Sequence, residues 1–221
     1  MTAIELISDA IIPLRSGDKV YTALKMMDEN RVSHLPVLDD GKYLGLISYD
    51  TLMVCEDETQ TMAAFKHELQ HISVRETAHF FDALRGMSLN KISMIAILDE
   101  ADHYLGAITG EELLAVLTDL LSLENPGGII ILELTQSDFS LAEIARLVES
   151  NDAKILSAGV RSLPGSPTLQ VTLKLNKINL EPIIQTLRRF EYEIHSYFGK
   201  NEKDEALLQE RYDALMMYLK M

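Results

Sequence analysis

The architecture of the first half of the chain follows from one stretch of sequence, Val32-Ser33-His34-Leu35-Pro36-Val37-Leu38-Asp39-Asp40-Gly41-Lys42-Tyr43-Leu44-Gly45-Leu46-Ile47-Ser48. An apolar run ends at Leu38, Asp39-Asp40-Gly41 is typical of a tight turn, and a second apolar run begins at Tyr43. Two such runs on either side of a turn predict a β-hairpin.

The same pattern recurs about 60 positions later, in Ile92-Ser93-Met94-Ile95-Ala96-Ile97-Leu98-Asp99 and Tyr104-Leu105-Gly106-Ala107-Ile108-Thr109. Each hairpin follows a segment with apolar residues at helical spacing, such as Val20, Ala23 and Met27 in the first copy. The repeat therefore predicts two β-α-β-β-α units, at residues 1–56 and 72–118, joined by a linker at 57–71.

The order of these elements, together with His34-Leu35-Pro36-Val37, Asp39, Gly45 and Ser48, resembles the cystathionine-β-synthase (CBS) domain. In the second copy Met94-Ile95-Ala96-Ile97 replaces the His-Leu-Pro-Val signature, so that copy is recognised through its alignment with the first. Two tandem copies are similar to a CBS pair, or Bateman module, and the resemblance implies a non-catalytic regulatory protein.

The second half of the chain has a different pattern. Asn125-Pro126-Gly127-Gly128 cannot continue a helix, which predicts a hinge at 119–127. The segment 128–200 then reads as β-α-β-β-α-β, the ferredoxin-like arrangement, and resembles the ACT domain. A CBS pair followed by an ACT domain is similar to the acetoin-utilisation type of CBS protein. The predicted class is α+β, ending in an amphipathic helix at 201–221.

Composition narrows the classes of partner. The chain has 221 residues, 47% of them hydrophobic, which is enough for buried cores. Its net charge of −14 disfavours nucleic acid and anionic membrane surfaces as partners. No apolar run approaches the length of a membrane helix, and the first residues do not read as a signal peptide, so a cytoplasmic location is expected. The single cysteine, Cys55, excludes an internal disulfide.

The resemblance implies a regulatory ligand such as AMP, ADP, ATP or S-adenosylmethionine in a cleft between the repeats. It assigns Ser48 and Thr109 to phosphate, and the ribose position to Thr51 in one copy and Glu112 in the other. A carboxylate can accept both ribose hydroxyls, so one site with Thr109 and Glu112 is expected. The alternative is that these hydroxyls only cap helices. The candidate nucleotide-binding residues are Ile12, His34, Leu35, Pro36, Ser48, Val74, Met94, Ile95, Thr109, Glu111 and Glu112.

In the ACT-like half, the turn before the first helix holds the candidate amino-acid-binding residues Gln136, Ser137, Asp138 and Phe139. The Pro-Gly pair of ligand-binding ACT domains is absent from this turn. Asp138 is most simply read as the helix N-cap. A purely dimerising role for this domain is therefore the alternative.

His67-Glu68-Leu69-Gln70-His71 matches the H-E-x-x-H signature of zinc proteases. That chemistry needs both histidines on one face of a continuous helix. The repeat alignment places Ile72-Ser73-Val74 in a strand, so His71 falls at or beyond the end of any helix. No metal is expected, and a metalloenzyme remains the third hypothesis.

The main functional hypothesis is a cytoplasmic sensor that binds an adenine ligand and passes a signal to its ACT-like domain or to an unidentified regulated protein. The second hypothesis is an assembly module whose ligand pockets have decayed. A homodimer is expected in both cases, because apolar faces would otherwise stay exposed.

Overall fold

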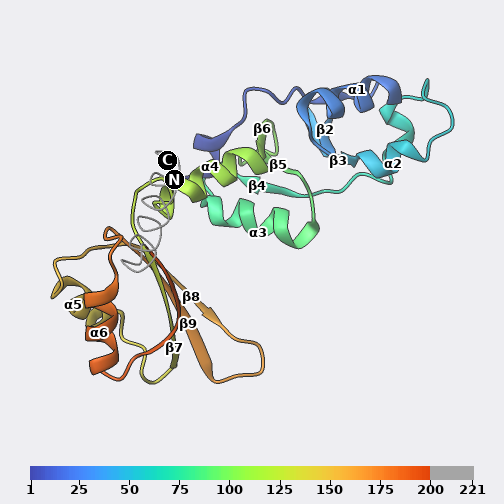
Figure 1. Cartoon of the computed structure of the whole chain (residues 1–221). Helices are drawn as coiled ribbons and strands as arrows, with labels where there is room; N and C mark the ends of the chain where they lie inside the picture. The colour runs from blue at the N-terminus through green and yellow to red at the C-terminus, as the bar shows by residue number, and fades with distance from the viewer. Residues whose placement is uncertain (200–221) are drawn as a thin grey trace, which may run out of the picture. The chain divides into compact units, whose positions relative to one another are not determined.

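The structure is a computed structural model that describes residues 1–199 (Figure 1). The chain divides into two compact units, Met1–Val116 and a second that begins at Leu117. The helix predicted for 201–221 lies outside the described residues. Within 1–199, no helix is both long and apolar enough to cross a membrane.

The first unit contains the predicted duplication. The first copy consists of η1 (Ala3–Leu6), β1 (Leu14–Arg15), α1 (Val20–Asn30), β2 (His34–Asp39), β3 (Lys42–Ser48) and α2 (Tyr49–Met53). The second consists of η2 (Met62–Phe65), β4 (Ser73–Arg75), α3 (Phe80–Asn90), β5 (Met94–Leu98), β6 (Tyr104–Thr109) and α4 (Gly110–Leu120). In each copy the first strand pairs parallel with the second, and the second pairs antiparallel with the third. The α+β duplication is therefore confirmed.

The local sequence explains these elements. The turn between β2 and β3 needs positive φ at two residues, and Asp40 and Gly41 supply it with φ of 47° and 81°. Helix α1 buries Val20, Ala23 and Met27 along one stripe. The β2 strand is buried from His34 to Val37, which matches its apolar run.

The lead-in segment of each repeat forms hydrogen bonds with the other repeat. The lead-in around η1 bonds to the second copy, where the Ala3 N–H donates to the Ala78 carbonyl at 2.8 Å and the Ser8 N–H to the Ala107 carbonyl at 2.9 Å. In the reverse direction, the Met62 N–H at the start of η2 donates to the Asp18 carbonyl at 2.9 Å. The two copies are therefore interlocked through their lead-in segments.

The second unit has the ferredoxin-like order that was predicted. Its elements are β7 (Ile129–Thr135), α5 (Leu141–Glu149), β8 (Ile155–Ser162), β9 (Thr168–Leu175), α6 (Glu181–Arg189) and β10 (Glu193–Phe198). The four strands lie in the order β10-β7-β9-β8, and all neighbours are antiparallel. This β-α-β-β-α-β arrangement confirms the predicted fold of the second half.

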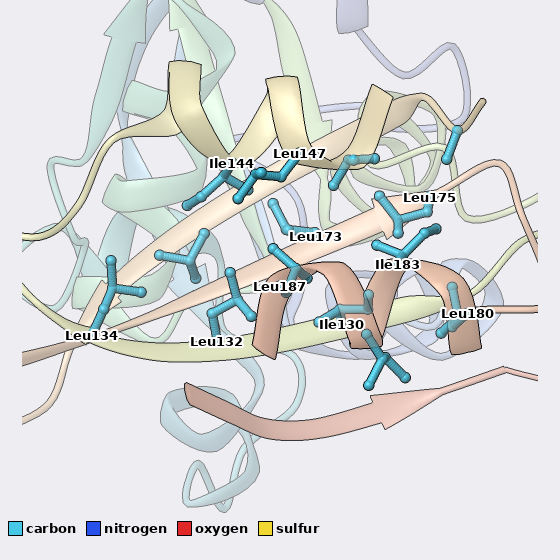
Figure 2. Packing of buried hydrophobic residues seen from close by; sticks show 14 residues of the cluster. Ile130, Leu132, Leu134, Ile144, Leu147, Leu173, Leu175, Leu180, Ile183 and Leu187 are labelled. Atoms are coloured by element: carbon cyan, nitrogen blue, oxygen red, sulfur yellow. The ribbon is translucent and has the colours of Figure 1, made fainter. Parts of the chain in front are cut away.

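The core of the second unit lies between its sheet and its two helices (Figure 2). Alternate residues of β7 and β9, including Leu132 and Leu173, are fully buried and face side chains of α5 and α6 such as Leu147 and Leu187. Every second residue of these strands and one stripe of each helix are apolar, so the sheet and the helices bury a single apolar layer between them.

Candidate functional site

A groove of about 690 Å³ lies in the first unit between the two repeats. This volume is within the range typical of small-molecule sites, roughly 300–1,000 Å³. The lining residues come from the lead-in segment, the end of α1, the α3–β5 region and the start of α4: Ser8, Ala10, Ile11, Glu29, Asn30, Arg31, Val32, Met87, Ile92, Ser93, Thr109, Gly110, Glu111 and Glu112.

The groove combines an apolar floor with a charged rim. Ile11, Met87 and Ile92 are 6 to 8% exposed, so they form its base. Glu29 and Arg31 lie exposed at the end of α1. Arg31 has a left-handed backbone with φ of 53° and ends the helix as its C-cap. Apolar surface beside a few convergent polar groups is typical of a binding site.

Thr109 and Glu112 are brought together at the start of α4. The Glu112 carboxylate accepts the Thr109 N–H at 3.0 Å and also accepts the Thr109 hydroxyl. The Glu111 N–H donates in turn to the Thr109 hydroxyl oxygen at 3.2 Å. These reciprocal bonds are those of a helix-capping arrangement, and they hold both side chains at the wall of the groove.

The electrostatic state of Glu112 follows from these partners. Burial opposes its ionisation, but hydrogen bonds from Ser8 and Thr109 outweigh that effect and hold the pKa of Glu112 below its usual range. The carboxylate is therefore ionised at neutral pH.

The matching position in the first repeat is built differently. The Ser48 hydroxyl accepts the Thr51 N–H at 3.1 Å, and the two hydroxyls lie 2.7 Å apart. Ser48 is thus the N-cap of α2, as its sequence position predicted. Thr51 occupies the place of the second-repeat carboxylate, so this position carries no charge.

His34 joins the two repeats. The Ser93 N–H donates to Nδ1 of His34 at 3.2 Å, and the Ser33 N–H donates to the Ser93 hydroxyl oxygen at 3.1 Å. Burial lowers the pKa of His34, and the Asp50 carboxylate opposes that shift. An N–H donated to Nδ1 requires that nitrogen to be unprotonated, so His34 is neutral in this contact.

Some of the predicted nucleotide-binding residues line the groove, and others lie outside it. Thr109, Glu111 and Glu112 line the groove. Ile11 lines it in place of Ile12, whose side chain is 67% exposed. The predicted residues outside the groove lining are Ile12, His34, Leu35, Pro36, Ser48, Val74, Met94 and Ile95. Met94 and Ile95 are fully buried in the core.

The sequence did not predict that residues of the lead-in segment and of the end of α1 line the groove. Ser8 and Ala10 precede the first strand of one repeat but face the other, because the lead-in segment crosses between copies. Asn30 is the last residue of α1, and Arg31 is its C-cap. No sequence pattern marked these positions, although Arg31 and Lys91 are equivalent in the duplication and both cap a helix with positive φ in the structure.

A second groove, of about 660 Å³, lies in the second unit beside the N-terminus of α5. Ser137 and Asp138 line it, whereas Gln136 does not and Phe139 packs against the hydrophobic core. Its other lining residues are Glu133, Leu134, Thr135, Ser140, Glu143, Thr168, Phe190, Glu191, Tyr192 and Glu193.

The N-cap of α5 is Ser140, and the prediction that Asp138 fills this role is wrong. The Ser140 hydroxyl oxygen accepts the Glu143 N–H at 3.3 Å. Asp138 lies two residues earlier, where its carboxylate accepts the Thr135 hydroxyl at 2.6 Å. The turn closes on itself through this bond, and the helix starts later than the acidic residue suggested.

The H-E-x-x-H segment does not lie on a continuous helix. The short helix η2 ends at Phe65, and the segment that follows pairs with β3 through the Gln70 N–H and the Leu46 carbonyl at 2.9 Å. His67 and His71 therefore do not share a helical face, which is the geometry that a zinc protease requires.

Comparison with known proteins identifies the first repeat. Residues 3–55 match the family model of the CBS domain. The first repeat is a CBS domain. The second repeat has the same element order and strand pairing, so the first unit is a tandem pair of CBS folds.

Individual relatives resemble about half of the chain. Inosine-5'-monophosphate dehydrogenase of Methanocaldococcus jannaschii is 26% identical over 111 residues, which cover 50% of this chain and 22% of that enzyme. A solved CBS domain pair/ACT domain protein from Thermotoga maritima is 17% identical, with a TM-score of 0.49, and the match covers 55% of this chain and 99% of that one. A Vibrio cholerae protein named for acetoin utilization is 20% identical, with a TM-score of 0.47, over 56% of this chain and 95% of that one.

Proposed function

We propose that this protein is a non-catalytic regulatory module that senses an adenine-containing small molecule in the groove between its CBS repeats. The observation that supports this most directly is the origin of the groove lining. Both repeats and the lead-in segment contribute residues, as Arg31, Thr109 and Ser8 illustrate. A ligand there contacts both copies at once, so its binding energy depends on how they are arranged.

The groove supplies the interactions that such a ligand needs. Ile11, Met87 and Ile92 offer apolar contact for a flat aromatic base. Glu111 and Glu112 offer carboxylate oxygens, which accept hydroxyl and amino donors.

Signal transfer follows if the ligand has different affinities for two arrangements of the repeats. The Ser8 N–H bond to the Ala107 carbonyl ties one wall of the groove to β6. Residue Ser93 lines the groove and also holds His34 of the other repeat. Movement at the wall thus reaches the contact between the copies. The proposed recipient of the signal is the ferredoxin-like unit or a partner protein.

The direct test is isothermal titration calorimetry on the full chain with adenosine, AMP, ADP, ATP and S-adenosylmethionine, backed by thermal shift. At least one adenine compound is expected to bind. Ala10→Trp, which fills the groove, should abolish that binding, whereas Ala101→Trp at an exposed turn of the second repeat should leave it intact. If none of the five compounds binds the unmodified chain, the proposal fails.

The hydrogen bonds that two hydroxyl groups make within the protein favour a second candidate function. Ser48 and Thr109 are both engaged in helix caps within the protein. An assembly module with decayed pockets would use them in this way only. It predicts a constitutive homodimer whose mass, measured by light scattering, does not respond to adenine compounds, whereas the sensor predicts a ligand-dependent change in stability.

A further inference from the structure

We infer that the groove between the repeats selects an adenine nucleoside without a phosphate group, in preference to AMP, ADP or ATP. The inference rests on the proposed function and concerns the chemistry of the ligand at the same groove. It is carried by the contact between Thr109 and Glu112 and by the charges around it.

Thr109 occupies the position that the family resemblance assigned to phosphate. In this chain its hydroxyl donates to the Glu112 carboxylate, which also accepts the Thr109 N–H at 3.0 Å. A phosphate that approached this hydroxyl would meet a carboxylate already bound to it. Two anions so close repel each other, and partial burial of the groove wall strengthens the repulsion.

Protonation of the Glu112 carboxylate is disfavoured. Hydrogen bonds from Ser8 and Thr109 stabilise its ionised form despite burial. Protonation to accommodate a phosphate would weaken those bonds. The ligand therefore encounters a fixed negative charge at physiological pH.

The remaining charges of the groove do not offset this one. Within residues 1–199, its lining has three carboxylates, Glu29, Glu111 and Glu112, and one cation, Arg31. Arg31 is exposed at the end of α1, where solvent and salt screen its charge. Among the lining residues that belong to the described part of the chain there is no lysine and no second arginine, although polyphosphates are usually bound by such side chains.

The start of α4 would ordinarily attract an anion, because helix N-termini carry partial positive charge. Here its first turn already contains Glu111 and Glu112. The Glu111 N–H donates to the Thr109 hydroxyl oxygen at 3.2 Å. The helix end is thus compensated by the chain itself, and what it presents to a ligand is acceptor oxygens.

Ionised carboxylates only accept hydrogen bonds, so a matching ligand must bring donors. The hydroxyls of a ribose and the amino group of adenine are such donors, and the apolar floor around Ile11 and Ile92 suits the base. A nucleoside provides all of these, and a phosphate adds only acceptors.

The test is calorimetry on the full chain with adenosine and AMP as probes. Adenosine is expected to bind at least about tenfold more tightly than AMP. Any AMP binding should strengthen as salt is raised from 50 to 500 mM, because screening weakens the repulsion, while adenosine binding stays nearly constant. The salt series uses the unmodified chain, so it does not depend on a variant that folds.

Glu112→Gln removes the charge beside Thr109 and is expected to raise AMP affinity at least about tenfold. Glu100→Gln, the matched control, removes an exposed charge of the second repeat that lies outside the groove lining, and it should leave AMP affinity nearly unchanged. Tighter binding of AMP than of adenosine by the unmodified chain, or equal effects of the two variants, would overturn the inference but leave the sensor proposal standing. Binding of neither probe would overturn the inference, and the remaining titrations would then decide the sensor proposal.

Discussion

Tyr43 and Tyr104 occupy equivalent positions in the two CBS repeats, yet their hydroxyls differ. Their rings stack with centroids 6.2 Å apart. The Tyr43 hydroxyl donates to the Ile72 carbonyl at 2.7 Å, whereas the Tyr104 hydroxyl is buried and, among residues 1–199, stands out as lacking a hydrogen-bond partner. Burial raises the pKa of both phenols, and for Tyr43 the neighbouring Tyr104 adds to the shift.

This asymmetry predicts opposite responses to the same substitution. Tyr43→Phe leaves the Ile72 carbonyl without its donor and should lower the free energy of unfolding by about 1–2 kcal/mol. Tyr104→Phe removes an unsatisfied buried hydroxyl and should be neutral or slightly stabilising. Urea denaturation of the full chain followed by circular dichroism measures both, and equal losses would contradict the assignment.

A residue-scale pH effect is expected at His34. Its pKa is lowered in the folded protein by burial, so the unfolded chain binds a proton at higher pH than the folded one. Stability is therefore fully present above the ordinary histidine pKa of about 6.5 and is lost as pH falls below it. The charged groups facing this side chain include Asp50, which opposes the shift.

The corresponding experiment compares unfolding of the unmodified chain with that of His34→Asn between pH 7.5 and 5. Asparagine can accept the Ser93 N–H without titrating, so the variant should lose less stability on acidification. Identical pH profiles would show that other groups set the acid response.

At the scale of elements, the N-cap of helix α5 is Ser140 and not the acidic residue that precedes it. Ser140 accepts the Glu143 N–H, while Asp138 belongs to the preceding turn. Ser140→Ala should cost about 1 kcal/mol of stability. Asp138→Ala should cost less than about 0.5 kcal/mol, because its carboxylate is exposed and its partner is a solvent-accessible hydroxyl. Thermal unfolding of the two variants ranks them, and the reverse ranking would restore Asp138 as the cap.

Gly127, two residues before β7, lies close against the backbone at the end of β9. A Cβ at Gly127, whose φ is 159°, would lie 1.8 Å from the Leu175 carbonyl oxygen, so the backbone has to move. Gly127→Ala should therefore destabilise the chain by more than about 2 kcal/mol. Gly159→Ala in β8, where nothing lies within 4 Å, is the control and should stay within about 0.5 kcal/mol. Similar melting temperatures for both variants would argue against the close approach.

At the scale of the whole molecule, duplication creates the groove that we propose as the binding site. A single CBS repeat supplies only one wall of the groove, with Arg31 on the first and Thr109 on the second. The lead-in segments cross between copies, so neither repeat is complete alone.

Much of this was determined by the sequence alone. The hairpin pattern around Asp39-Asp40-Gly41 and its recurrence depend on local turn chemistry and on periodicity, which each segment carries by itself. The β-α-β-β-α-β order of the second unit was predictable for the same reason. The repeat alignment also placed Thr109, Glu111 and Glu112 at a strand end and the helix start that follows it, and their role in binding a ligand stays a prediction.

Tertiary structure decided the rest. Ser8 and Ala10 reach the groove because the lead-in segment crosses to the second repeat, and no local pattern records such a crossing. Arg31, at the end of α1, meets second-repeat residues there only in the folded pair. The sequence located Thr109 and Glu112 three residues apart, but their mutual hydrogen bonds depend on the backbone of a folded strand end and helix start. That contact, rather than the residue types, fixes where the Glu112 carboxylate lies at the groove wall.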